Sequence, residues 1–188
     1  MSAVGCLRRH IERNLMTLLT LPEIKAKVDQ LANIIDAPQD ILPTYGSSNQ
    51  TGHPHIEIGS QGYYYLVLER GIVCDRLVTT DINEILYKIF AGVTFELSHK
   101  YELAHRIKNQ DSRRISFQKQ VELLSILSAE WSERQSQEHE QILKQHPFDD
   151  YASIRATLTK ELREQGHSDE VAWKMACEEY PLPKVSEG

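Results

Sequence analysis

Residues 55–79, which read HIEIGSQGYYYLVLERGIVCDRLVT, decide the fold class. Residues 55–58 alternate polar and apolar side chains, and residues 63–69 and 72–78 are rich in aromatic and β-branched residues, as is typical of strands. Glycines at 59, 62 and 71 mark short turns between them. Residues 53–79 are therefore expected to form a three-stranded antiparallel meander.

Helical patterns lie on both sides of the strands. Residues 1–45 are expected to hold N-terminal helices, because Leu7, Ile11 and Leu15 share one helical face and Pro22 opens a second stripe. Residues 38–52 contain two prolines and two glycines and are expected to be a loop.

Residues 81–180 are expected to be helical. Thr80 or Asp81 caps a first helix, which residues 91–94 interrupt, and apolar positions from Ile115 onward predict one long helix over 112–144. The second half of that helix, SERQSQEHEQ, lacks an apolar stripe and is expected to project into solvent or to face a partner. Two shorter helices, 150–165 and 169–179, follow, separated by Gly166. A sheet this small needs helices on one face.

These patterns predict one α+β domain over residues 1–188, with the three-stranded meander packed against a mostly helical body that contains one long helix. The chain has 40% hydrophobic and 26% charged residues, as is ordinary for a globular protein. Its net charge of −6 argues against nonspecific nucleic-acid binding and against an anionic membrane surface. The acidic excess lies in residues 122–188, which hold 7 basic and 14 acidic side chains.

The cysteines and histidines give no sign of a metal site or a disulfide framework. Cys6, Cys74 and Cys177 are far apart, as in proteins of a reducing compartment, and no apolar segment is long enough to span a membrane, so a cytoplasmic location is expected. The pairs His53/His55 and His99/His105 lack zinc-site spacing, and the chain has no phosphate-binding or nucleophile motif. The expectation is a protein that is not an enzyme and has no cofactor.

The stretch NQDSRRISFQKQ, residues 109–120, raises an electrostatic question. Asp111 fits a helix N-cap, yet Arg113 and Arg114 follow in the first turn, where a cation costs about 0.3–1 kcal/mol. One interpretation is that these arginines and Arg106 pair with carboxylates of their own chain, such as Glu84, Glu96, Glu102 or Asp111, and also satisfy carbonyls of the preceding helix. The alternative is that they recognise a partner.

The aromatic residues also have two interpretations. The run at residues 63–65 is a candidate stacking platform for bases, although alternate tyrosines that pack in the core are favoured. Trp131 likewise has two interpretations, a core or helix-packing residue and a recognition anchor, and the packing role is favoured.

Several of these segments together resemble the bacterial immunity protein 63 family. The similar pieces are GYYYLVLERG, DINEILYKIFAGVTFELSHKYEL, HRIKNQDSRRISFQKQVELLSIL and HPFDD, with a spaced set at Arg106, Asp111, Arg113, Arg114, Phe117, Gln120 and Trp131. The resemblance covers roughly residues 53–150 and does not extend to 1–45 or 151–188. It implies a non-catalytic protein of a polymorphic toxin system that binds a cognate toxin domain and neutralises it, and a structural role for the spaced set.

The acidic C-terminal third is the candidate toxin-facing surface, with Glu133, Glu138, Glu140, Asp149 and Asp150 as its residues. Such a surface suits a basic partner, for example a nuclease. Two other classes remain open. A regulatory or nucleic-acid-binding module that used Arg106, Arg113 and Arg114 would need a basic face, and an enzyme would need a pocket with convergent polar groups. The sequence leaves the oligomeric state open.

Overall fold

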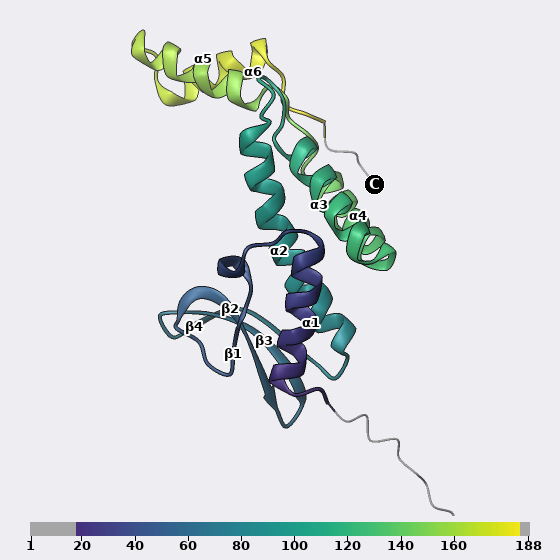
Figure 1. The fold of residues 1–188 in the computed structure, drawn as a ribbon. Coiled ribbons are helices and arrows are strands. Elements are labelled where there is room, and N and C mark those ends of the chain that lie inside the picture. Colours follow the sequence, from purple (N-terminus) through teal and green to yellow (C-terminus); the bar gives the residue numbers. More distant parts are fainter. Residues whose placement is uncertain (1–17, 185–188) are drawn as a thin grey trace, which may run out of the picture.

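The computed structural model describes residues 18–184 and has the predicted α+β architecture (Figure 1). In chain order the elements are α1 (Leu21–Ile34), the 3-10 helix η1 (Gln39–Ile41), β1 (Thr44–Tyr45), β2 (Thr51–Gly59), β3 (Gly62–Glu69), β4 (Ile72–Thr79), α2 (Ile82–Ala104), α3 (Arg113–Leu127), α4 (Ala129–Gln145), α5 (Ala152–Glu164) and α6 (Asp169–Glu179). The predicted helix through Leu7, Ile11 and Leu15 lies outside the described residues.

The sheet has four strands in the order β1-β2-β3-β4, one more than predicted. The meander β2-β3-β4 is antiparallel as expected, with Ile56 opposite Tyr65 and Tyr65 opposite Leu77. The added strand β1 pairs parallel with β2, and it lies with η1 inside the segment predicted to be a loop. A two-residue strand carries no periodic pattern of its own, so only its tertiary pairing reveals it.

Two glycines set the turns of the meander. Arg70 and Gly71 have φ of 50° and 82°, as both central residues of a two-residue type I′ hairpin require. Gly62 has φ of 122°, and a Cβ there would collide with the Thr79 carbonyl oxygen of β4. The hairpin therefore needs glycine at position 62 for two separate reasons.

One apolar core joins the sheet to the first four α-helices. Tyr63 and Tyr65 of β3 are buried in it, so the core interpretation of the tyrosine run is confirmed, and Tyr64 points to the other face of the sheet. Trp131 of α4 is 5% exposed and lies 6.0 Å, centroid to centroid, from the stacked ring of Phe90 on α2. The helix-packing interpretation of Trp131 is therefore confirmed.

The prediction of one long helix over 112–144 is wrong. The chain leaves helical geometry at Ser128, with φ −161° and ψ 127°, and the Ser128 hydroxyl accepts a hydrogen bond from the Trp131 N–H to cap α4. The break folds α4 back against α3 and lets it contribute Trp131 to the core. The expected interruption at 91–94 is also wrong, because α2 runs unbroken from Ile82 to Ala104.

The segment SERQSQEHEQ, residues 132–141, lies within α4 and packs against α3 along one face, so it does not project freely from the body. Gln135 and His139 are each 6% exposed, and they contact Gln120 of α3 by hydrogen bonds. Polar side chains that are buried in this way satisfy one another across the helices, so the face they form carries no apolar stripe in the sequence. Absence of a stripe was therefore a poor guide to exposure.

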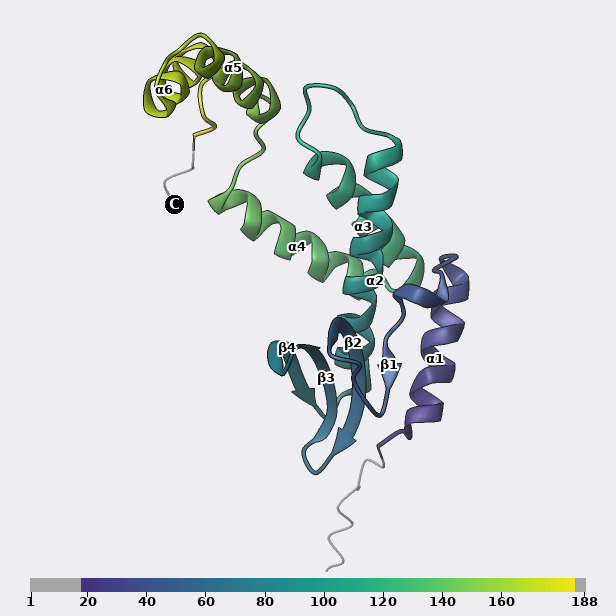
Figure 2. The same cartoon turned by 90° about the vertical axis from the view of Figure 1, so that its left-hand side faces the viewer.

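The helices α5 and α6 form a hairpin that stands apart from the rest of the protein (Figures 1 and 2). Their bounds agree with the prediction, and Gly166 between them has φ of 96°. The buried apolar residues of this hairpin, Leu162, Ala172 and Ala176, are separate from the main core. Among residues 18–184 no helix is both long enough and apolar enough to cross a membrane.

Candidate functional site

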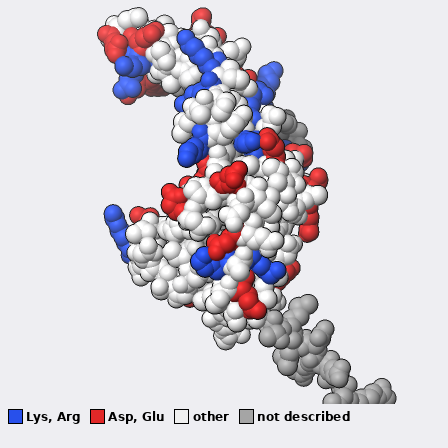
Figure 3. Space-filling model, viewed as in Figure 1, with Lys and Arg blue, Asp and Glu red and all other residues white. Residues whose placement is uncertain are grey.

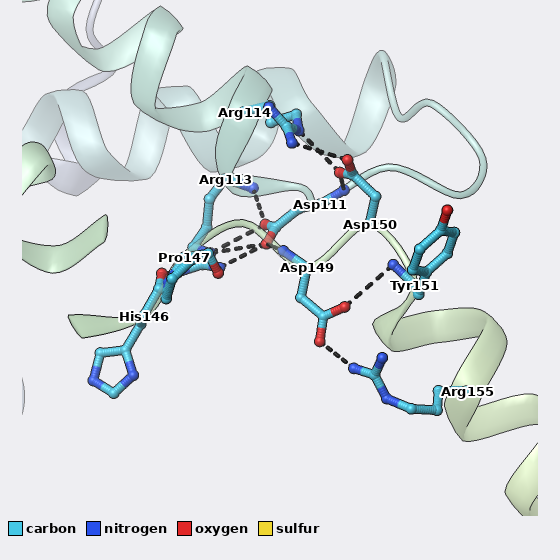
Figure 4. A network of polar contacts seen from close by, with 9 residues as sticks. All are labelled: Asp111, Arg113, Arg114, His146, Pro147, Asp149, Asp150, Tyr151 and Arg155. Carbon is cyan, nitrogen blue, oxygen red and sulfur yellow. Dashed lines mark hydrogen bonds and ion pairs between the residues drawn. The ribbon is translucent and has the colours of Figure 1, made fainter. Parts of the chain in front are cut away.

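Asp111 lies at the centre of a polar network that joins the α2–α3 loop to the linker between α4 and α5 (Figure 4). Its carboxylate accepts hydrogen bonds from the Arg113 backbone N–H at 2.9 Å and from the Asp149 backbone N–H at 2.9 Å. Its own backbone N–H donates to Asp150 Oδ1 at 2.9 Å. The N-cap residue of α3 is Ser112, one position later than predicted, but the Asp111 carboxylate still lies at the start of the helix, where the helix dipole favours an anion.

Arg113 connects the start of α3 to the end of α4. Its guanidinium contacts both carboxylate oxygens of Asp111, with Nη2 2.6 Å from Oδ2. Nη1 and Nη2 also donate to the carbonyl oxygens of His146 and Pro147, each at 2.8 Å. These two carbonyl groups follow α4. The prediction that the arginines bond carbonyl oxygens at the end of the preceding helix, α2, is therefore wrong for Arg113.

Arg114 forms a two-point ion pair with Asp150, Nε to Oδ1 and Nη2 to Oδ2, both at 2.9 Å. Its guanidinium carbon also lies 4.2 Å from the centroid of the Phe148 ring. The fork geometry matches the carboxylate, and the aromatic face attracts the cation. Arg114 therefore holds the linker from the α3 side.

Asp149 continues the network to the hairpin. Its carboxylate pairs with Arg155 of α5, whose side chain is 2% exposed, and accepts the Tyr151 backbone N–H. Arg155 Nη1 also donates to the carbonyl oxygens of Tyr180 and Pro181, just after α6. A continuous series of charged hydrogen bonds therefore fixes α5 and the end of α6 to the start of α3.

The network perturbs the pKa values of two of its acceptor carboxylates, Asp111 and Asp150. Burial of Asp111 raises its pKa, but the side-chain bonds from Arg113 and the backbone N–H groups of Asp149 and Arg113 outweigh that effect and lower the pKa to about 2. The ion pair with Arg114 and the Asp111 N–H lower the pKa of Asp150. Both groups are therefore ionised at neutral pH.

Each of the three arginines that were predicted to form ion pairs within the chain has a carboxylate partner there. Arg106 pairs with Glu102, as Nε to Oε1 at 2.8 Å, which was one of the predicted contacts. Glu84 instead pairs with Arg134 of α4, and Asp150 takes Arg114. Arg106, Arg113 and Arg114 are thus neutralised locally, which disfavours the interpretation of this cluster as a nucleic-acid contact.

The helix α4 is fastened to the body along its inner face. The Trp131 indole N–H donates to Asn83 Oδ1 at 3.1 Å, and the Tyr87 hydroxyl donates to Glu138 Oε1 at 2.9 Å. His139 stacks on Phe117 with ring centroids 3.8 Å apart, and burial lowers its pKa, so its imidazole is neutral at pH 7. The opposite face of α4 is held rigidly towards solvent as a result.

The five candidate toxin-facing carboxylates fall into two groups. Glu133 and Glu140 are exposed on the outer face of α4, seven residues apart, and Glu130, three residues before Glu133, joins them there. None of these three has an ion-pair partner among residues 18–184. Glu138 bonds Tyr87, and Asp149 and Asp150 belong to the network, so these three are engaged within the chain. We refer to Glu130, Glu133 and Glu140 as the α4 acidic stripe.

A groove of about 1140 Å³ opens beside the network, between the α2–α3 loop and the α5–α6 hairpin. Its lining includes Ile107 of the loop, Ile154 and Leu158 of α5, and Met175 of α6. Sequence reasoning missed this groove. The available signal was Ile107, an apolar residue within a polar loop, together with the apolar pair Ile154 and Leu158 on one face of α5.

Comparison with known families matched one part of the chain. Residues 59–141 match the family model described as Immunity protein 63, which confirms the predicted resemblance over that part of the chain. The matched segment contains Arg106, Asp111, Arg113, Arg114 and Trp131. It ends before Asp149, and so does not include the α5–α6 hairpin. Comparison with curated proteins and comparison with solved structures each gave no match.

Proposed function

We propose that this protein is an immunity protein that binds a cognate toxin domain and thereby neutralises it. The observation that carries the proposal is the Immunity protein 63 match over residues 59–141, a family whose description implies a toxin partner. Proteins of this class act by occupying the toxin and not by catalysis. Cytoplasmic action in a bacterium, within a polymorphic toxin system, is part of the proposal.

The α4 acidic stripe is the proposed first contact with the toxin. Its three carboxylates are spaced along one helical face, and the inner face of α4 is anchored by Trp131 and His139, so the stripe is presented on a rigid support. A rigid helix loses little conformational entropy on binding. The partner that complements it is a basic surface, such as that of a nuclease domain.

The charge distribution elsewhere is compatible with this assignment. Figure 3 shows acidic and basic side chains interspersed over one face of the protein, including the free end of the hairpin, where both kinds lie together. That face presents no broad basic surface of the kind that nucleic-acid binding requires.

Association kinetics test this proposal. The probe is the purified toxin domain encoded beside this protein, rendered inactive, and the variant is E130K/E133K/E140K. Because steering by surface charge acts on the association rate and is screened by salt, the variant should associate at least tenfold more slowly at low salt and less so at high salt.

The matched control is D40K/E69K/E96K, which changes the net charge equally at exposed carboxylates on η1, β3 and α2. We expect it to retain most of the wild-type rate. Equal slowing in both variants would show that net charge alone acts and would remove the α4 acidic stripe. Failure of the wild-type protein to bind or protect against the toxin domain would refute the immunity function.

A further inference from the structure

The groove between the α2–α3 loop and the hairpin gathers exposed apolar side chains at one concave place. Ile107 is 55% exposed and Met175 is 39% exposed, and both line the groove. Single exposed apolar residues are common on protein surfaces, but several that converge on one hollow mark an interaction site. This groove therefore differs from the scattered exposed residues elsewhere.

The hairpin wall of the groove is formed by faces of two helices, and the opposite wall is the α2–α3 loop. On α5 the lining residues Ile154, Leu158 and Glu161 are spaced by four and three positions, and on α6 Met175 and Glu179 are spaced by four, so each set shares one helical face. Within residues 18–184, the strands contribute no residue to the groove lining. An α-helix of about 10 Å diameter and about three turns would occupy a comparable volume. Its natural occupant is thus a helix and not an added strand.

The charged residues in the groove lining indicate which kind of partner helix would bind there. Glu161 and Glu179 line its hairpin side, and neither has an ion-pair partner among residues 18–184. On the other side Arg106 is paired with Glu102, and Lys108 also lines the groove without an ion-pair partner among residues 18–184, so the unpaired carboxylates lie on the hairpin side and the unpaired cation lies on the loop side. The two carboxylates are placed to receive lysine or arginine side chains from an occupant whose apolar side chains lie between Ile107 and Met175.

The network around Asp111 holds this groove in shape. Asp111, Ser112 and Asp149 are themselves part of its lining, and the Asp149–Arg155 ion pair fixes the α5 wall. The hairpin has a small core of its own, so its orientation depends on these contacts. The predicted motif therefore acts on the groove indirectly, by positioning its walls.

We infer that this groove receives an amphipathic, basic helix of the cognate toxin, with apolar side chains seated between Ile107 and Met175 and cationic side chains facing Glu161 and Glu179. The inference rests on the proposed function, and it adds a contact outside the family-matched segment. The hairpin then supplies partner specificity, while the matched segment supplies the scaffold.

The test is the dissociation constant of the same inactive toxin domain for two variants of the full chain. I107S/M175S should raise it at least tenfold with little dependence on salt, because apolar contacts are lost. E161K/E179K should raise it at least tenfold at low salt and less at high salt. All four side chains lie at exposed positions, so the variants should fold, which circular dichroism and thermal melting would check.

Matched controls are I72S/I126S, which removes exposed apolar residues elsewhere, and E164K/E178K, which changes charge on α5 and α6 outside the groove lining. Both should bind within about twofold of wild type. Wild-type affinity in the two groove variants would overturn the inference and leave the immunity function standing. Sedimentation provides a second check. If the wild type is a dimer and I107S/M175S is a monomer with unchanged toxin affinity, the groove binds a second copy of this chain, and the inference is overturned as well.

Discussion

Substitution of Asp111 by asparagine tests the structural interpretation of the arginine cluster. One carboxylate oxygen, Oδ2, accepts both Arg113 Nη2 and the Asp149 backbone N–H. Asparagine keeps one acceptor oxygen and replaces the other with an NH₂ donor, so two or more donors of this partly buried site lose their acceptor. We expect D111N to lower the free energy of unfolding by about 2 kcal/mol.

The pKa of Asp111 gives a second route to this magnitude. The fall of the pKa from 3.8 to about 2 corresponds to at most about 2–3 kcal/mol, at about 1.4 kcal/mol per pKa unit. The Asp111 side chain is 9% exposed but Arg113 is 29% exposed, so solvent screening reduces the contribution to about 1–2 kcal/mol.

The assay is urea unfolding of wild type and D111N at pH 7 and at pH 3, with thermal melting as a second readout. A loss of about 2 kcal/mol corresponds to a decrease in melting temperature of roughly 4–8 °C for a chain of this size. Because the folded-state pKa lies below the unfolded-state value, the contribution of Asp111 is complete above about pH 4 and is lost as the pH falls through about 2. The difference between the two proteins should therefore be smaller at pH 3.

The control is D29N, which removes the exposed ion pair between Asp29 and Lys25 on α1 and should cost no more than about 0.5 kcal/mol. Equal stability of D111N and wild type at pH 7 would refute the argument that the network holds the fold together. A difference that grows towards pH 3 would refute the electrostatic explanation in particular.

Two further predictions concern His139 and Gly62. Burial holds the pKa of His139 below its usual value of 6.5, so the neutral imidazole stabilises the fold above about pH 6.5, and this stabilisation is lost as the pH falls. Wild type should therefore lose more stability than H139Q between pH 7.5 and 5.5. Identical losses in the two proteins would show that His139 is not responsible. Gly62→Ala should destabilise the protein by at least about 2 kcal/mol, because the added Cβ meets the Thr79 carbonyl. Gly71→Ala, also at positive φ but in open space, should cost only about 1 kcal/mol. Equal melting temperatures for the two variants would contradict this reasoning.

The local parts of the fold were readable from the sequence because their signals lie within a few residues. The meander was predicted from its alternation and its glycine turns, and Asp81 does cap α2, with its carboxylate accepting the Asn83 N–H at 2.8 Å. Pro22 lies in the first turn of α1, as expected, and Gly166 does separate α5 from α6. Strand alternation, helix caps and glycine turns depend on neighbouring residues, so they need no tertiary information.

The candidate site could be predicted only in part, because some of its contacts join segments that are distant in the sequence. The cation-rich start of α3 showed that a counter-charge was needed, and its partner Asp111 lies two residues from Arg113. The partner of Arg114, Asp150, is 36 residues away, and Asp150 was instead assigned to the toxin-facing surface. An ion pair between distant segments leaves no periodic signal in either one.

The α+β class, the antiparallel meander, the bounds of α5 and α6 and the need for a counter-charge near Arg113 could all be predicted from the sequence alone. The break at Ser128, the pairing of β1 and the groove beside Ile107 became visible only in the tertiary structure, because each depends on which surfaces meet. The inner face of α4 is the clearest case. Gln135 and His139 are polar, so the sequence placed them in solvent, yet their hydrogen bonds to Gln120 let them be buried. Burial of a polar side chain is permitted by its partners, and those partners lie on another helix.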